Sequence, residues 1–469
     1  MTARAVADAA WPPYAFDRRL EPAAAAPIAV ALSGGGDSLA ALLATHDWAQ
    51  RVGRRLVVLT VDHGLQAQSR DWTRFAAMLA GRIGADFEAL AWTGDKPATG
   101  LAAAARSARH RLIAAAARRH GARVVVFGHT ADDVAEAELM RREGSSVGAP
   151  REWAPSPVWP EGREVFLLRP LLDLSRAEIR ERLVALGESW IDDPANENPT
   201  SLRARARIAM QQGGEIGRTR HGGCDGPTPP PSLRFASRHL PRSAVEDNDT
   251  LVLQRETGER SAKPTEGAPG RRASVLDPDL LCAAGVLTLA RKSFRSNPDP
   301  APPRLLGAAL TSVGGGDRPP RGDRLAALAD RLAREGDVTA TLVGAKIIAD
   351  SRQILIVRNA GEAARGGLAP LTLAPGETGI WDGRFEITAG AVPVTIEPLA
   401  GHAKTLTAKP RGRLRSIPAA ARGALPTHVD PAAGRTCPIL AQSPLLRVRS
   451  LVAARFAAAC GVISKEPAA

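Results

Sequence analysis

The sequence predicts an α/β fold in which a parallel β-sheet carries helices on both faces, followed by a small, basic, β-rich C-terminal region. Continuous apolar runs recur along the first part of the chain, and each is followed by a stretch with helical character. Apolar runs joined in this way by crossover helices are typical of a parallel sheet that is covered on both faces. Polar residues also gather directly after the runs, at the edge where such sheets bind their ligands.

The elements follow from the apolar periodicity in chain order. Strands are expected at residues 28–32, 56–62, 86–92 and 123–129. Helices are expected at residues 39–51, 70–82, 101–119, 132–142 and 175–186. In the C-terminal part we expect a short helix near 323–334, two β runs within 339–359 around a turn at Asp350–Ser351, and a β segment at 380–388.

Composition divides the chain into four regions. They are a flexible N-terminal segment at 1–27, an α/β domain at 28–210 that we expect to be catalytic, a connecting region at 211–300 and a C-terminal region at 301–469 that we expect to bind nucleic acid. Within the connecting region, the stretch from Gln211 to about Arg272 is rich in Gly, Pro and Ser and shows no sustained helical or strand period. It is either a linker without regular structure or a stretch altered by a sequence error such as a frameshift.

Several protein classes are excluded by simple counts. No apolar run approaches the roughly 18 residues of a membrane helix, and the N-terminal segment has no apolar core of a secretion signal. The four cysteines stand singly, which argues against a disulfide scaffold or a zinc ribbon. We therefore expect a cytoplasmic protein without a membrane part. No stable protein partner can be inferred, and the sequence leaves a homodimer open.

Charge is distributed unevenly along the chain. Residues 1–200 hold 24 basic and 25 acidic side chains, a net charge of −1, out of a total of +13, so the remainder holds 38 and 24, a net charge of +14. A near-neutral first part and a basic second part indicate a catalytic module followed by a module that meets a polyanion such as nucleic acid. Compositional bias is the alternative, because only seven of the 62 basic residues are lysines.

A glycine-rich loop stands between the first strand and the first helix. It reads Ser33, Gly34, Gly35, Gly36, Asp37, Ser38. Glycines allow a phosphate to approach the backbone closely, and the helix N-terminus and the serine hydroxyls offer hydrogen-bond donors to it. The loop lacks the lysine of a Walker loop, which disfavours transfer of a γ-phosphoryl group. A plain strand-to-helix turn is the alternative. A second cluster, Gly314–Gly316, follows no strand and is interpreted as a loop.

The loop sequence SGGGDS resembles the pyrophosphate loop of the N-type ATP pyrophosphatases. Five further motifs resemble, in the same order, those of the tRNA(Ile)-lysidine synthase family: VDHGLQAQS (61–69), AARSARHRL (104–112), GHTADDVAE (128–136), LLRPLL (167–172) and DPANENPTSLRARAR (193–207). The resemblance implies an enzyme that uses ATP to adenylate the wobble cytidine, at C2, of the isoleucine tRNA with anticodon CAU. The amino group of free lysine then displaces AMP, forming lysidine, and pyrophosphate is the other product.

The resemblance assigns the nucleotide site. Ser33 to Ser38 would bind the ATP phosphates, with Asp37 close to a metal ion. Asp62 and His63, which end the second strand, would flank the nucleotide. Asp37 and Asp133 are the candidate ligands of Mg²⁺.

Two further groups of charged residues are implied to be catalytic. Arg106 and Arg109 stand at i and i+3 of one helix and would address phosphate or a developing oxyanion, unless they only form a solvated face. Asp132, Asp133 and Glu136 begin another helix and would hold Mg²⁺ and bind or deprotonate the lysine amine. Favourable placement of acids in the helix dipole is the alternative for this second group.

In the last motif, Asp193, Asn196, Arg203 and Arg207 are implied to meet the tRNA, with a capped helix and exposed basic residues as the alternative. The chain departs from the family pattern at His110, where tyrosine is usual, and at Ala137, where threonine is usual. The connecting region departs as well, because it is rich in Pro and Gly where the family commonly has a helical domain. Two other functions stay open: a tRNA thiolase with the same loop, disfavoured because residues 1–207 contain no cysteine, and an inactive ATP- and tRNA-binding relative.

Overall fold

The computed structural model describes Trp11 and residues 14–65, 68–142, 148–155, 159–192, 278–295, 301–317, 319–334, 336–432 and 434–467. Residues 1–209 and 277–469 make up one unit and residues 210–276 another, and the second unit lies outside the described residues. The expected linker from Gln211 to Arg272 therefore also lies outside them. In the described part of the chain, no helix is long and apolar enough to cross a membrane.

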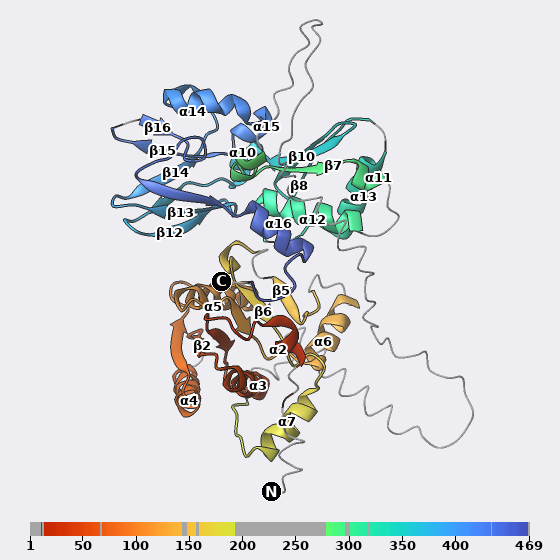
Figure 1. Ribbon diagram of the computed structural model, residues 1–469, viewed down its shortest axis with the longest axis vertical. Coiled ribbons are helices and arrows are strands. Elements are labelled where there is room, and N and C mark those ends of the chain that lie inside the picture. Colours follow the sequence, from red (N-terminus) through yellow and green to blue (C-terminus); the bar gives the residue numbers. More distant parts are fainter. Residues whose placement is uncertain are drawn as a thin grey trace, which may run out of the picture. The chain divides into compact units, whose positions relative to one another are not determined.

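A six-stranded sheet forms the centre of the first part of the chain (Figure 1). Its spatial order is β3 (Asp86–Ala91), β2 (Leu56–Asp62), β1 (Ile28–Ala31), β4 (Val124–Val126), β6 (Phe166–Leu168) and β5 (Trp153–Pro155). The first five strands are parallel, as expected, with Ile28 opposite Leu56 on one side and Val124 on the other. Strand β5 is antiparallel to β6, because the short connection between them contains no crossover helix. Neither β5 nor β6 was expected from the sequence.

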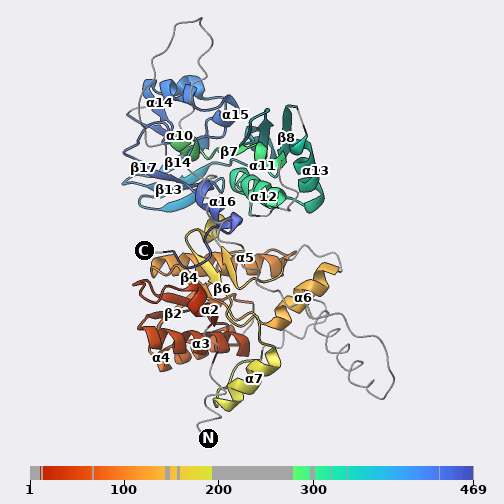
Figure 2. The same cartoon turned by 45° about the vertical axis from the view of Figure 1, so that its right-hand side comes forward.

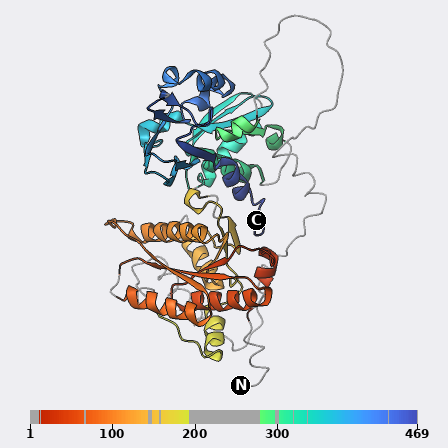
Figure 3. The same ribbon diagram turned by 60° about the vertical axis from the view of Figure 1, so that its left-hand side comes forward.

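Helices cover both faces of this sheet, as the views in Figures 2 and 3 show. Helices α3 (Gly36–Val52) and α4 (Ser69–Arg82) pack on one face and α5 (Leu101–Arg119) packs on the other. This part of the chain also contains α6 (Ala131–Arg142), α7 (Arg176–Ala185) and the 3-10 turn η2 (Pro160–Gly162). Alternation along β1 divides the core in two. Ile28 and Val30 face the cluster that contains α3 and α4, whereas Ala29 faces the cluster that contains α5.

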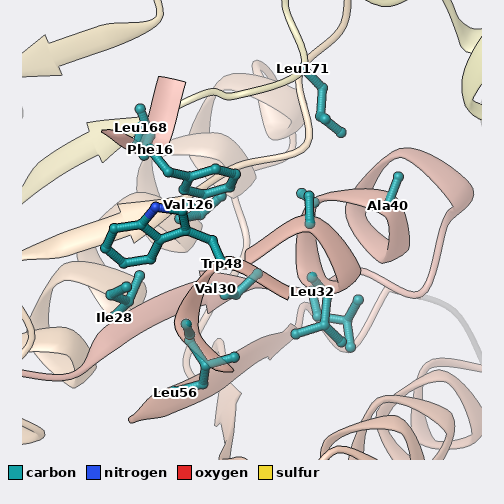
Figure 4. Packing of buried hydrophobic residues seen from close by; sticks show 14 of the residues in the cluster. Phe16, Ile28, Val30, Leu32, Ala40, Trp48, Leu56, Val126, Leu168 and Leu171 are labelled. Carbon is teal, nitrogen blue, oxygen red and sulfur yellow. The ribbon is translucent and has the colours of Figure 1, made fainter. Parts of the chain in front are cut away.

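The N-terminal segment differs from the expected flexible one. Residues Tyr14–Arg19 form the helix α2, and the Phe16 side chain is only 1% exposed. The Phe16 ring stacks on that of Trp48 (Figure 4), with a centroid distance of 5.9 Å. The Trp48 indole N–H donates a hydrogen bond to the Asp17 carboxylate at 2.7 Å. The apolar face of this short helix is buried against α3, because Trp48 needs a partner on its outer side.

Three antiparallel sheets make the C-terminal part β-rich, as expected. The first sheet has the spatial order β7 (Leu287–Ala290), β10 (Gln353–Arg358), β9 (Ala345–Ala349), β8 (Val338–Leu342). The second has the order β11 (Leu371–Leu373), β14 (Val394–Pro398), β15 (Pro426–Asp430), β16 (Gly434–Thr436). The third has the order β12 (Thr378–Trp381), β13 (Phe385–Ala389), β17 (Leu446–Ser450). The turn expected at Asp350–Ser351 lies between β9 and β10. The first of the two β runs expected within 339–359 contains an additional turn, so residues 338–358 form three strands, and the run expected at 380–388 contains one as well, so residues 378–389 form a hairpin.

The helices described in the C-terminal part are α10 (Pro278–Ala283), α11 (Lys292–Arg295), α12 (Ala301–Gly314), α13 (Gly322–Ala333), α14 (Ala408–Arg413), α15 (Ala419–Arg422) and α16 (Val452–Cys460), with 3-10 turns η5 (Ala360–Arg365), η6 (Ala403–Thr405) and η7 (Leu414–Ser416). Most of these helices have fewer than ten residues, and α12 and α13 are longer. Because α10 and β7 precede residue 301, the expected boundary of the connecting region at 300 is too late. Strand β7 pairs with β10 through Leu289 and Ile354, so it belongs to the C-terminal part.

Candidate active site

The glycine-rich loop lies between β1 and the N-terminus of α3, at the carboxyl end of the sheet. The Ser38 hydroxyl donates to the Gly35 carbonyl at 2.8 Å, and the Ser33 backbone N–H donates to the Ser38 oxygen at 3.2 Å. These bonds close the loop on itself around the start of α3. Gly34 has a φ of +90°, which favours glycine, and a Cβ there would lie 2.9 Å from the Ile191 side chain. The loop therefore has the compact backbone that a phosphate-binding turn needs.

Gly128 supports this loop from the neighbouring strand. It follows β4, and a Cβ built on it would overlap the Asp37 carbonyl oxygen and lie 2.8 Å from the Cα of Ser38. Backbone therefore contacts backbone at this point, and only glycine leaves the space for it. Local patterns do not indicate this approach, because it joins two loops that are about 90 residues apart.

The acidic residues of α6 lie at the N-terminus of that helix, as expected. Asp133 and Glu136 are buried, with 5% and 1% exposure. The Asp133 carboxylate accepts hydrogen bonds from the Thr130 backbone N–H at 2.9 Å and the Thr130 hydroxyl at 3.2 Å. Asp132 faces differently, because its carboxylate accepts the backbone N–H of Arg176 at 2.8 Å. Asp132 and Asp133 therefore have different hydrogen-bond partners.

Arg176 joins the loop to the acidic residues. Its guanidinium forms ion pairs with Asp37 at 3.1 Å, with Asp133 at 3.0 Å and with Glu136 at 2.6 Å. Sequence reasoning missed this residue. A weak signal was present, however: a cation at the first position of a helix is placed unfavourably in the helix dipole, which acids nearby in the fold would compensate.

Burial and Arg176 act on the Asp37 carboxyl in opposite directions. Burial raises the pKa of Asp37, and the Arg176 guanidinium opposes that rise without cancelling it. The described residues contain no group of three or more His, Cys, Asp or Glu side chains arranged to hold a metal ion. Asp37 and Asp133, the two candidate Mg²⁺ ligands, are instead held beside one another by the same guanidinium.

A second group of charged residues is cationic and includes Arg106 and Arg109 of α5. Burial above all, and then the charges of Arg109 and Arg106, lower the pKa of His110 to about 3. Burial also lowers the pKa of His63, with a smaller contribution from Arg109, so the end of β2 and this face of α5 lie within electrostatic reach of each other. The ring of His110 stacks on Phe127 at a centroid distance of 5.5 Å, which explains how histidine occupies the position where tyrosine is usual.

Arg169 connects the cationic and acidic groups. Burial and the nearby Arg106 charge lower its pKa to about 10, whereas Asp133 opposes that change. Its guanidinium donates to His129 Nδ1 at 3.1 Å, so the proton of a neutral His129 ring lies on Nε2. The LLRPLL motif thus contributes a buried cation, which was not among the residues predicted from the sequence.

The remaining predicted residues fall into two sets. Asp62 ends β2, and its carboxylate accepts the Gly64 backbone N–H at 2.7 Å, while His63 meets the Trp92 ring edge-on at 6.0 Å. Both stay candidates for contacts with a nucleotide. Asp193, Asn196, Arg203 and Arg207 lie outside the described residues.

Comparison with known proteins extends these observations to nearly the whole chain. A family model described as the PP-loop domain matches residues 13–212. The tRNA(Ile)-lysidine synthase of Caulobacter vibrioides is 44% identical over 458 residues, which cover 96% of this chain and 97% of that protein. The proteins with the same name from Hyphomonas neptunium and Rhizobium meliloti are 34% and 31% identical and cover 74% and 79% of this chain, and 85% and 74% of their own lengths.

Proposed function

The chain belongs to the tRNA(Ile)-lysidine synthase family, and on that basis we propose that it joins lysine to C2 of the wobble cytidine in the isoleucine tRNA with anticodon CAU. It is a carbon–nitrogen ligase that consumes ATP. The observation that carries the proposal is the 44% identity with a lysidine synthase over 96% of the chain. The reaction belongs to the cytoplasm, where tRNA and ATP meet.

The first step is adenylation of the cytidine. The C2 oxygen attacks the α-phosphorus of ATP, the bond to the β-phosphate breaks, and pyrophosphate leaves. The loop from Ser33 to Ser38 supports this role because its backbone N–H groups at the start of α3 can receive phosphate oxygens. Mg²⁺ commonly takes only one or two protein carboxylates together with phosphate oxygens, so Asp37 and Asp133 fit it, and it would neutralise the charge of the pyrophosphate.

The second step needs a neutral amine. Free lysine has a side-chain pKa near 10.4, so only about one molecule in 10³ has a neutral side chain at pH 7. Asp133 and Glu136 support the proposal because a buried pair of carboxylates can attract the ammonium group and receive its proton. The amine nitrogen then forms a bond to C2, and AMP leaves with the former C2 oxygen. Arg106 and Arg109 would stabilise the charge on that leaving phosphate.

Recognition of the tRNA would involve two parts of the chain that are far apart in the sequence. Asp193, Asn196, Arg203 and Arg207 would contact the tRNA near the reacting cytidine, and the basic C-terminal part would bind its phosphates. A thiolase is disfavoured, since the cysteines that the structure describes, Cys282, Cys437 and Cys460, all lie in the C-terminal part.

Incubation with ATP, Mg²⁺, radiolabelled lysine and the CAU isoleucine tRNA tests the proposal. We expect label in the tRNA, with AMP and pyrophosphate formed in equal amounts. The matched control is the same tRNA with guanosine in place of the wobble cytidine, which should stay unlabelled. Sulfur incorporation would instead indicate a thiolase, and ATP binding without any tRNA product would indicate an inactive relative.

A further inference from the structure

One side chain touches both halves of the proposed reaction. The Arg176 guanidinium forms ion pairs with Asp37 in the glycine-rich loop, which is here called the ATP loop, and with Asp133 and Glu136 at the start of α6. The distances are 2.6 to 3.1 Å. The two groups of acids come from elements that are about a hundred residues apart in the chain. Among the described residues, the ion pairs of Arg176 thus connect the loop proposed to bind ATP with the acids proposed to receive lysine.

Charge and burial indicate why a cation is needed there. Three carboxylates around one guanidinium leave a formal charge of −2, and the Glu136 side chain is 1% exposed. Carboxylates that are brought together away from water repel one another strongly, and a buried one without a partner is costly. Without Arg176, the acids would separate or take up protons. With it, the remaining negative charge suits one divalent ion or one ammonium group.

The backbone fixes the position of Arg176. Its N–H donates to the Asp132 carboxylate at 2.8 Å, and the preceding Ser175 closes a capping box with Glu178. The start of α7 is therefore tied to the start of α6 both through the main chain and through the side chain. A guanidinium held in this way has a planar fork whose donors point at several oxygens in fixed directions, whereas the three donors of an ammonium group share one nitrogen and rotate.

We propose that Arg176 is a positioning residue that holds the carboxylate of the ATP loop and the carboxylates that receive lysine in one fixed arrangement. This inference rests on the proposed function. Because Arg176 serves both sides, its removal should impair adenylation and lysine use together. Removal of the Asp37 carboxylate should impair adenylation alone, and removal of the Glu136 carboxylate should impair lysine use alone.

The test uses the full chain with Arg176→Gln and Arg176→Lys. Two quantities are measured: pyrophosphate release that depends on tRNA in the absence of lysine, and the KM for lysine in the complete reaction. For Arg176→Gln we expect slower release and a higher KM for lysine, each by about 10-fold to 10²-fold, as when reacting groups are misplaced by about 1 Å. Arg176→Lys keeps the charge but not the fork, so we expect an intermediate KM.

Arg182→Gln is the matched control, because it removes the same charge from the same helix, where Arg182 lies over the Trp11 ring. It should leave both quantities unchanged. A lower kcat with an unchanged KM for lysine in both Arg176 variants would mean a merely structural role and would overturn the inference. If Arg176→Gln does not fold, Arg176→Lys decides by the same criterion. Failure of the unmodified chain to label tRNA would instead overturn the proposed function, and this inference with it.

Discussion

Single residues set opposite charges on the two sides of the candidate site. Arg176 gathers Asp37, Asp133 and Glu136 on one side, whereas Arg169 and the arginines of α5 make the other side cationic. The arrangement suits a reaction that brings a negatively charged nucleotide and a positively charged amine to one carbon atom. Each charged residue can therefore be tested by the partial reaction that it serves.

Asp37 and Glu136 should separate the two partial reactions. We expect Asp37→Ala to lower adenylation about 10²-fold or more, as when one electrostatic interaction with a transition state is removed. Glu136→Gln should permit adenylation but weaken lysine use, so that adenylated tRNA accumulates and can be detected by electrophoresis. The reverse pattern would require the nucleotide and lysine roles to be exchanged.

His110 should make stability depend on pH. Its pKa is about 3 in the folded chain, against an ordinary value of about 6.5, so below pH 6.5 the unfolded chain binds a proton that the folded chain does not. The stabilisation from neutral His110 is full above pH 6.5 and is lost as the pH falls toward 3. Denaturant unfolding at pH 7 and pH 5 should show a smaller decrease for His110→Phe than for the unmodified chain. The exposed His402→Phe is the control, and an equal decrease in all three chains would contradict this account.

Gly128 should be intolerant of a methyl group. Its Cβ would overlap the Asp37 carbonyl, so Gly128→Ala must displace the ATP loop. We expect a cost of about 1–3 kcal/mol in the free energy of unfolding, as for other overpacked sites, and weaker ATP binding by calorimetry. Gly81→Ala is the control, because no atom lies within 4 Å of the Cβ position there. ATP binding unchanged in Gly128→Ala would show that the loop can move without harm to the site.

In the C-terminal elements, charge and burial must be considered together. This part is basic by sequence, but Arg291, Arg358, Arg384 and Arg455 are buried there, with at most 7% exposure. Arg291, for example, donates to the Leu332, Arg334 and Gly336 carbonyls and serves to hold turns together. Buried arginines of this kind cannot meet a polyanion, so the net charge of the sequence overstates the basic surface.

The exposed basic surface is concentrated around α14. Residues 398–429 contain no acidic side chain, and Lys404, Lys409, Arg411, Arg413 and Arg415 are all exposed. Arg411 and Arg413 also donate to the Leu406 and Leu440 carbonyls, which fixes them on the surface. Among the described elements, this segment is therefore the one that we expect to contribute most to the salt dependence of tRNA binding.

Neutralising part of the basic segment at 398–429 should make tRNA binding depend less on salt. The triple variant Lys404→Gln, Lys409→Gln, Arg415→Gln removes three cations and leaves in place the two arginines that bond to carbonyls. The slope of log K against log salt should fall by about 0.7 to 0.9 for each tRNA phosphate that is no longer neutralised. A triple variant of the exposed Arg51, Arg55 and Arg74 is the control. Equal slopes in the two triple variants would show that α14 does not meet the tRNA.

Across the whole molecule, the end of the chain is bound to the first domain. Glu466 and Arg54 form an ion pair at 2.6 Å in which both side chains are 1% exposed. Arg54 also donates to the Glu21 carbonyl at 2.9 Å, and Trp153 donates to the Ile463 carbonyl at 2.9 Å. Segments that are more than 400 residues apart thus share one buried polar network.

Breaking this network from one side should be costly. Glu466→Gln leaves the buried Arg54 charge without its carboxylate, for which we expect a decrease of about 3–5 kcal/mol in the free energy of unfolding. Arg54→Met together with Glu466→Met removes both charges and should cost less than Glu466→Gln. The exposed pair Arg142 and Glu138 gives the control, where Glu138→Gln should cost less than about 1 kcal/mol. A similar small cost for Glu466→Gln would mean that water reaches Arg54.

Local sequence patterns were enough to predict most elements of the first domain and the glycine-rich loop. Apolar runs such as residues 56–62 are short and rich in β-branched residues, which is typical of a buried strand. The spacing of glycines and serines at 33–38 is local as well. The ends of the predicted strands therefore indicated that the polar residues that follow them would lie together at one edge of the sheet. The prediction for residues 14–19 was wrong, because a short helix without its partner Trp48 carries too weak a pattern.

Which charges meet one another could be learned only from the folded chain. Arg176, Arg169, Gly128 and Glu466 each act on residues that are tens to hundreds of positions away. Ion pairs and close backbone approaches depend on distances in space, and the one-dimensional pattern contains no such distances until the sheet order is known. The turn at Asp350–Ser351 was predicted correctly, whereas the turn at Val343–Gly344 was missed, because strand pairing, and not local composition, fixes where each strand ends.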